Sequence, residues 1–196
     1  MAEANTLTKE KETPAQARGK RAAKLQKLKQ ADTINFAVDP AVRAYLAQAA
    51  KSEGLDLSHM MQKIVEAYVI DTAPADLALA KRLAAKRQVI DSVQATAAKM
   101  DADGAFDEHF ILNVVNTAAK DADFAAAYDT ATAAEGEGDK AQTRARRVRT
   151  ALNQQMGRVI KRTVGAKSMR KDGGGIERGT ATDALIATYT RLVKPA

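Results

Sequence analysis

Residues 33–39 (TINFAVD) carry the pattern that most limits how this chain can fold. Ile34, Phe36 and Val38 alternate with polar or small residues, which is the period of a half-buried β-strand. No other segment predicts a strand with comparable clarity, and a lone strand leaves its backbone donors and acceptors unpaired. We therefore expect it to pair, antiparallel about a two-fold axis, with the same strand of a second copy, so that these apolar side chains form a dimer core.

Two helices are predicted to follow the strand directly. Pro40 is a favourable first residue for a helix that runs to about Glu53, after Asp39 as its N-cap. Gly54 ends this helix, and Asp56 can cap a second helix that ends before residue 74, which is proline. The apolar positions expected on their inner faces are Val42, Leu46, Ala49, Met60, Met61, Ile64, Val65, Tyr68 and Val69.

This order of elements resembles a known family. The segment TINFAVDPAVRAYLAQAAKSEGLDLSHMMQKIVEAYV resembles the ribbon-helix-helix fold of Arc-type and methionine-repressor-type DNA-binding regulators, over about residues 32–71 only. The matching features are the alternating strand, the Asp-Pro helix start, Gly54 between the helices, and the Leu57-Ser58-His59-Met60-Met61 opening of the second helix. The rest of the chain shows no such resemblance.

The resemblance implies how such a dimer would bind DNA. The paired strands would enter the major groove as a ribbon, and the second helix would hold a phosphate at its N-terminus. By position, the base-reading residues would be Thr33, Asn35 and Ala37, and the phosphate-binding residues Leu57, Ser58 and His59. Asn35 can pair bidentately with adenine, whereas Ala37 offers only a methyl contact. Asp56 departs from this scheme because it places a negative charge beside the expected phosphate.

Charge is distributed in blocks along the chain, which carries +7 overall. Residues 1–31 hold 8 basic and 3 acidic side chains, residues 32–139 hold 9 and 18, and residues 140–178 hold 12 and 2. Basic blocks of this kind favour contact with phosphate, although a solubilising tail and a solvated helix face remain open alternatives. The expected phosphate-binding side chains are Arg18, Lys20, Arg21, Lys24, Lys27 and Lys29 in a flexible tail (1–31), and Arg144, Arg146, Arg147, Arg149, Arg158, Lys161, Arg162, Lys167, Arg170 and Lys171 in the second block.

The remainder of the chain predicts helices, so the expected fold class is mainly α, with a ribbon-helix-helix module (32–73) followed by a helical C-terminal region. A helical connector or bundle (75–134) comprises helices over about 75–100, 106–119 and 123–134. A basic helical region (140–196) comprises a helix over 142–163 and a final helix over 180–193. The glycine-rich stretch 165–175 between them suits either a loop that moulds to a nucleic-acid backbone or a hinge.

Several classes of function find no support in the sequence. The chain has no Cys and only two histidines, His59 and His109, which we expect at capping or surface positions rather than at a metal site. The segment Gly165–Ser168 lacks the glycine and the preceding strand of a nucleotide-binding loop. No nucleophile constellation is present. We therefore expect no enzyme activity, no cofactor and no metal.

The expected function is that of a homodimeric, or higher-order, DNA-binding protein that acts as a transcriptional repressor or as a plasmid or phage accessory factor. Its partner would be double-stranded DNA, with a possible protein partner for the helical C-terminal region. We expect it to be cytoplasmic, associated with the nucleoid and free of membrane. The alternatives are a packaging or structural protein that uses the module only as a dimer clamp, and an interaction module for an acidic protein.

Overall fold

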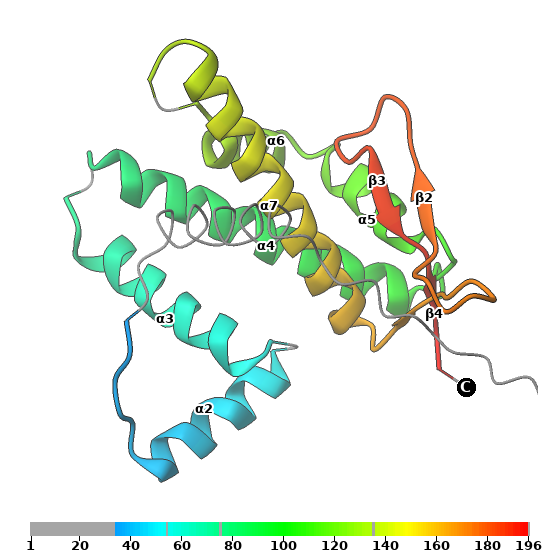
Figure 1. The fold of residues 1–196 in the computed structure, drawn as a ribbon, viewed down its shortest axis with the longest axis horizontal. Helices are drawn as coiled ribbons and strands as arrows, with labels where there is room; N and C mark the ends of the chain where they lie inside the picture. Colours follow the sequence, from blue (N-terminus) through cyan, green and yellow to red (C-terminus); the bar gives the residue numbers. More distant parts are fainter. Residues whose placement is uncertain (1–33, 54, 75, 135, 196) are drawn as a thin grey trace, which may run out of the picture. The chain divides into compact units, whose positions relative to one another are not determined.

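The computed structural model describes residues 34–53, 55–74, 76–134 and 136–195. The fold is mainly α, as predicted, and contains short two-stranded sheets near its C-terminus (Figure 1). The chain divides into two units, residues 1–40 and residues 41–196. The helices are α2 (Pro40–Ser52), α3 (Leu57–Thr72), α4 (Ala78–Ala102), α5 (Phe110–Ala118), α6 (Ala122–Thr132) and α7 (Asp139–Thr163), and the strands are β1 (Lys167–Ser168), β2 (Arg178–Thr180), β3 (Thr188–Thr190) and β4 (Leu192–Val193).

The hydrophobic core lies among α4, α5, α6 and α7. α4 packs along α6 and α7 and also contacts α5 and α3. Val89 and Val93 of α4, Phe110 of α5 and Met156 and Ile160 of α7 are fully buried there. Each helix presents one apolar stripe to this centre, which is the pattern expected of an amphipathic helix in a small bundle.

Local features of the sequence mark where α6 and α7 begin. Asp121 caps α6 by accepting a hydrogen bond from the backbone N–H of Asp123 at 2.8 Å. Gly138 precedes α7 with a φ of 82°, a left-handed conformation that glycine adopts without strain. The predicted helices over 75–100, 106–119, 123–134 and 142–163 are thus confirmed to within a few residues.

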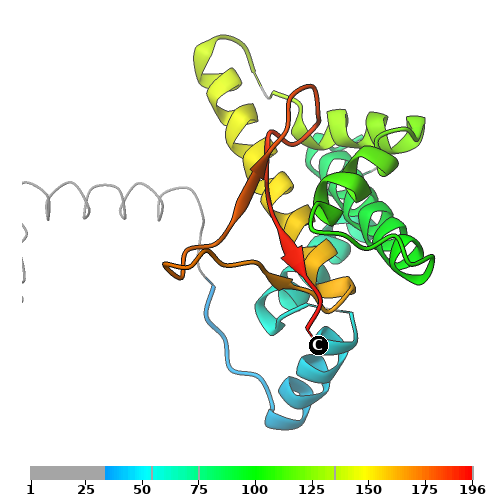
Figure 2. The same ribbon diagram turned by 90° about the vertical axis from the view of Figure 1, so that its right-hand side faces the viewer.

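The C-terminal region departs from the prediction. The expected helix over 180–193 is wrong, because β2 pairs antiparallel with β3 and β1 pairs with β4. Leu185, Tyr189 and Leu192 have helical spacing, but the β-branched Thr188 and Thr190 on either side of Tyr189 favour an extended strand. In Figure 2 the orange β2 and the red β3 run side by side next to the yellow α7. The expectation that the chain has no second strand is wrong for the same reason.

The N-terminal ribbon is the other correction. Residues 34–39 form no strand in the described chain, and all of them are solvent-exposed. A strand requires a hydrogen-bonded neighbour, and neither of the strand pairs among the described residues includes this segment. The two helices predicted after it are confirmed as α2 and α3. The described chain therefore contains no unpaired strand at residues 34–39, and the feature of this segment that bears on dimerisation is the exposure of its side chains.

Candidate nucleic-acid interface

The side chains of residues 34–38 face solvent. Ile34 is 82 % exposed, Phe36 62 % and Val38 37 %. Asn35 and Ala37, two of the predicted base-reading residues, are exposed as well, whereas the third, Thr33, lies outside the described residues. The segment therefore leaves both its apolar and its polar side chains free to contact another molecule.

The apolar faces of α2 and α3 are also exposed. Val42 and Tyr45 of α2 are 47 % and 72 % exposed, and Ile64, Val65 and Tyr68 of α3 are 41 %, 58 % and 69 % exposed. Each helix buries one residue among those described, Ala50 of α2 and Met60 of α3. Soluble monomers rarely expose this many large apolar groups on consecutive elements, and such surfaces mark interaction sites.

The start of α3 is held by Asp56. Its carboxylate accepts the backbone N–H of His59 at 3.0 Å, lies 2.8 Å from the Nδ1 atom of the His59 ring, and accepts a hydrogen bond from Arg162 of α7 at 3.1 Å. The His59 N–H and ring, and then the Arg162 guanidinium, hold the pKa of this carboxyl far below its usual range. The helix cap predicted at Asp56 is confirmed.

These contacts bear on the predicted phosphate site at Leu57, Ser58 and His59. The three residues do open α3, but Asp56 already accepts the His59 N–H, and its negative charge occupies the position of the expected anion. Arg162, a predicted phosphate-binding residue, forms an ion pair with this carboxylate. The N-terminus of α3 is therefore already occupied by an anion of the chain itself, the Asp56 carboxylate.

The other basic residues of α7 point away from the core. Arg144, Arg146, Arg147, Arg149 and Arg158 all lie outside it and are solvent-exposed. Lys161 is half-buried and donates a hydrogen bond to Ser168 Oγ at 3.3 Å. After α7, Lys167 of β1 and the loop residues Arg170 and Lys171 lie at the surface, and Arg170 donates to the Gly174 carbonyl at 2.8 Å. The predicted residues of the tail, Arg18, Lys20, Arg21, Lys24, Lys27 and Lys29, lie outside the described residues.

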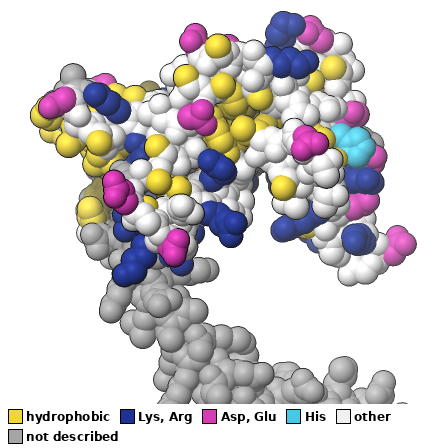
Figure 3. Space-filling model, turned by 90° about the horizontal axis from the view of Figure 1, so that it is seen from above, with side chains coloured by type: hydrophobic (Ala, Val, Ile, Leu, Met, Phe, Trp, Pro, Cys, Tyr) yellow, Lys and Arg dark blue, Asp and Glu magenta, His cyan; other side chains and the backbone are white. Residues whose placement is uncertain are grey.

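A groove lies between α7 and the C-terminal strands. Its volume is about 490 Å³, and three cations line it: Arg158 and Lys161 from α7, and Arg178 from β2. None of the described residues that line it is acidic. The remaining lining residues are Ile111, Thr150, Asn153, Gln154, Gly157, Ser168, Ile176, Ile186, Thr188, Tyr189 and Thr190. Seen from above, the described surface shows hydrophobic side chains in a hollow near its centre, with Lys, Arg, Asp and Glu side chains around it (Figure 3).

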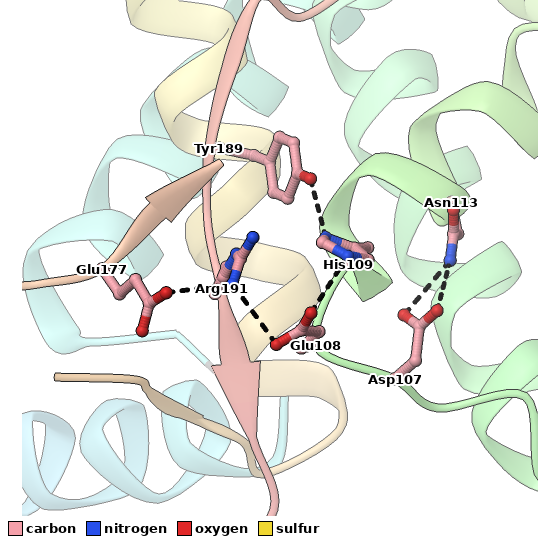
Figure 4. Close-up of polar contacts among 7 residues, drawn as sticks. All are labelled: Asp107, Glu108, His109, Asn113, Glu177, Tyr189 and Arg191. Carbon is pink, nitrogen blue, oxygen red and sulfur yellow. Dashed lines mark hydrogen bonds and ion pairs between the residues drawn. The ribbon is translucent and has the colours of Figure 1, made fainter. Parts of the chain in front are cut away.

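A polar network fixes one wall of this groove. Tyr189 of β3 forms a 2.7 Å hydrogen bond with His109 Nδ1, and His109 Nε2 lies 3.1 Å from Glu108 (Figure 4). Arg191 lies 3.6 Å from Glu108 and donates to Glu177 at 2.9 Å. These contacts attach β3 and the residue before β4 to the loop that precedes α5. They also hold the Tyr189 ring in one position.

The sequence alone does not reveal this network or the place of Arg178. His109 and Tyr189 are 80 residues apart, and no local spacing connects them. His109 does stand at the start of α5, but its side chain makes no capping hydrogen bond and bonds to Tyr189 instead. Arg178 lies at the end of the basic block, and only the pairing of β2 with β3 brings it to the groove.

Metal sites and membrane spans find no support in the part of the chain that the structure describes. No group of three or more His, Cys, Asp or Glu side chains there could hold a metal ion. None of the described helices is both long and apolar enough to cross a bilayer. No family model, curated protein or solved structure matches the chain.

Proposed function

We propose that this chain is a homodimeric DNA-binding protein of the ribbon-helix-helix kind, acting as a transcriptional repressor or as a plasmid or phage accessory factor. The observation that carries the proposal is the exposure of large apolar side chains on residues 34–38, α2 and α3. Burial of such a side chain is favourable, by about 1.5–3 kcal/mol for one that passes from full exposure to full burial and by less for these partly covered ones, before the costs of association. A surface of this composition favours a permanent partner.

A second copy of the same chain is the partner that fits these residues best. In a two-fold dimer, residues 34–38 of each copy would pair antiparallel and supply the neighbouring strand that the described part of a single chain does not provide. Ile34, Phe36 and Val38 would then face the helices of both copies. Their 37–82 % exposure in the single chain would be lost in the dimer.

The DNA-facing side of this dimer would hold the alternate residues of the ribbon. Asn35 and Ala37 are exposed, and Asn35 is the residue of the two that can make a bidentate contact with a base edge. The basic side chains on the surface of α7 would add phosphate contacts that are independent of sequence. Specificity and affinity would thus come from different parts of the chain.

One observation favours a second candidate, a packaging protein that uses residues 34–72 only as a dimer clamp. Asp56 fills the N-terminus of α3 with its own carboxylate, so a phosphate contact there would require the Asp56–His59 hydrogen bond to break. In that case DNA would be held by the basic residues of α7 without preference for sequence. Protein interaction with an acidic partner is the third candidate.

Binding to two duplexes at about 150 mM salt tests these functions. One duplex carries a preferred site selected from a random pool, and the other has a random sequence. Replacing Asn35 with Ala is expected to weaken binding to the preferred site by about 1–3 kcal/mol and to affect random DNA much less, because phosphate contacts are unchanged. Equal losses on both duplexes would contradict ribbon readout and favour packaging.

The matched variant changes charge instead of base contact. Replacing Arg144, Arg146, Arg147 and Arg149 by Gln should weaken binding to both duplexes alike. It should also make binding less dependent on salt. A plot of the logarithm of the binding constant against the logarithm of the salt concentration should become less steep, by about 0.9 for each phosphate that the variant no longer neutralises. If the native chain binds no duplex at low salt, the DNA-binding proposal is wrong. Such a result would favour the third candidate, interaction with an acidic protein partner.

A further inference from the structure

We infer that the groove between α7 and β2–β3 binds a nucleotide unit, with its phosphate on the basic rim and its base on the apolar floor. The source of the unit is either a free mononucleotide or one nucleotide of a single strand, since both offer the same chemistry. This site is separate from residues 34–72. The inference does not depend on the proposed dimer or on its contacts with duplex DNA.

The basic rim has no internal counter-charge in the described part of the chain. Arg158 and Arg178 line the groove, and neither side chain forms an ion pair or a hydrogen bond with another described residue. Lys161 gives one hydrogen bond to Ser168 and retains further donors. Because no acidic side chain is among the described lining residues, these three cations create a positive potential that favours an anion. The paired N–H donors of an arginine guanidinium also match the spacing of phosphate oxygens.

The floor of the groove has a different character. Ile111, Ile186 and the ring of Tyr189 line it, and Ile186 and Tyr189 are only 3 % and 8 % exposed. The Tyr189 ring is held by its hydrogen bond to His109, so the floor is formed before a ligand arrives. Together with Ile176, which also lines the groove and is 47 % exposed, these side chains give a nucleobase an apolar surface to lie against.

Polar side chains complete the groove between its rim and its floor. Gln154, Thr188 and Thr190 line it and can both donate and accept hydrogen bonds. The volume of about 490 Å³ lies within the range of pockets for small organic ligands. A nucleotide site needs hydrogen-bond donors for the phosphate, an apolar surface for the base, and amide or hydroxyl groups for the polar edges. A site for a bare anion would need only the hydrogen-bond donors.

Calorimetric titration of the full-length chain tests this inference with four probes: ATP, a short oligothymidylate, inorganic phosphate and unphosphorylated thymidine. ATP or the oligonucleotide should bind more tightly than phosphate or thymidine alone. If ATP binds, the source is a free nucleotide. If only the oligonucleotide binds, the source is a single strand. No binding of either nucleotide probe, or phosphate binding as tightly as ATP, would overturn the inference.

Two variants locate the binding in the groove. Replacing Arg158 and Arg178 with Gln should weaken binding by about tenfold or more, because the variant cannot form two charge-assisted hydrogen bonds to the phosphate. The control, Lys81→Gln with Lys120→Gln, makes the same change of charge at exposed positions that do not line the groove, and should change binding little. Equal losses in the two double variants would show general attraction rather than a site.

A substitution at Gly157 tests the shape of the groove without changing its charge. Gly157 lines the groove, and a Cβ built there would be 3.8 Å from the side chain of Ile111, an ordinary contact. Gly157→Leu should block the groove and weaken nucleotide binding, whereas Gly157→Ala should retain it. Circular dichroism of both variants serves as the control for folding. Unchanged binding by a folded Gly157→Leu variant would overturn the inference even if the arginine variants weakened binding.

Discussion

Asp56 shows how much one side chain decides at the end of a helix. It caps α3, contacts the His59 ring and pairs with Arg162 of α7, which is 106 residues away in the sequence. The cap is predictable, because aspartate before a helix accepts a backbone N–H three residues on. The pairing with Arg162 is not, since nothing in the spacing of the two residues indicates it.

The stability that Asp56 confers should depend on pH. Its pKa is lowered in the folded chain, so its stabilisation is complete above the ordinary value of 3.8 and declines as the pH falls below it. Asp56→Asn keeps a capping oxygen but loses the charge, and should lower the free energy of unfolding at pH 7 by about 1 kcal/mol or less, because the group is half exposed. Asp56→Ala loses the cap too and should lower it by about 0.5–2 kcal/mol.

Urea unfolding at pH 7 and at pH 3 measures this effect. The difference between the native chain and Asp56→Asn should shrink at the lower pH, where the carboxyl of the unfolded chain is already largely protonated while that of the folded chain remains ionised. A difference that stays the same or grows at pH 3 would show that the charge of Asp56 does not stabilise the folded state.

Among the elements, the β2–β3 pair is one that the sequence does not predict. Helical periodicity is a strong signal over the 25 residues of α4 or α7, whereas strands of two or three residues carry almost none. Gly179 and Tyr189 oppose each other across the pair, and the ring of Tyr189 covers the glycine. This contact depends on a register that only the folded chain defines. The groove is therefore unpredictable from the sequence, although its basic residues on α7 stand out there.

Two glycine substitutions should have opposite effects on stability. A Cβ at Gly179 would lie 2.4 Å from the Tyr189 ring, so Gly179→Ala must displace the ring from His109 and should lower the free energy of unfolding by about 1–3 kcal/mol. Gly157→Ala meets only an ordinary contact inside α7 and should raise that free energy by about 1 kcal/mol. Denaturant titration measures both. A Gly179→Ala variant as stable as the native chain would contradict the described packing of β2 on β3.

At the scale of the whole molecule, burial and exposure are unevenly shared. The main core is built from α4, α5, α6, α7 and the C-terminal strands, and no described residue before Ala85 belongs to it. Residues 34–72 instead carry most of the exposed large apolar side chains. The sequence predicts which of these residues are apolar and on which helices they lie. It cannot show that the described part of the chain leaves them uncovered, because that depends on where the core forms.

The oligomeric state tests the central claim, that a second copy covers these side chains. Sedimentation equilibrium of the full-length chain should give twice the mass of one chain, and Phe36→Asp should give a monomer that keeps its helical circular dichroism, since Phe36 is 62 % exposed and outside the main core. The control Val193→Asp changes a residue that is 46 % exposed near the other end of the chain and should remain dimeric. A native chain that sediments as a monomer at micromolar concentrations, or a Phe36→Asp variant that remains a dimer, would contradict the account.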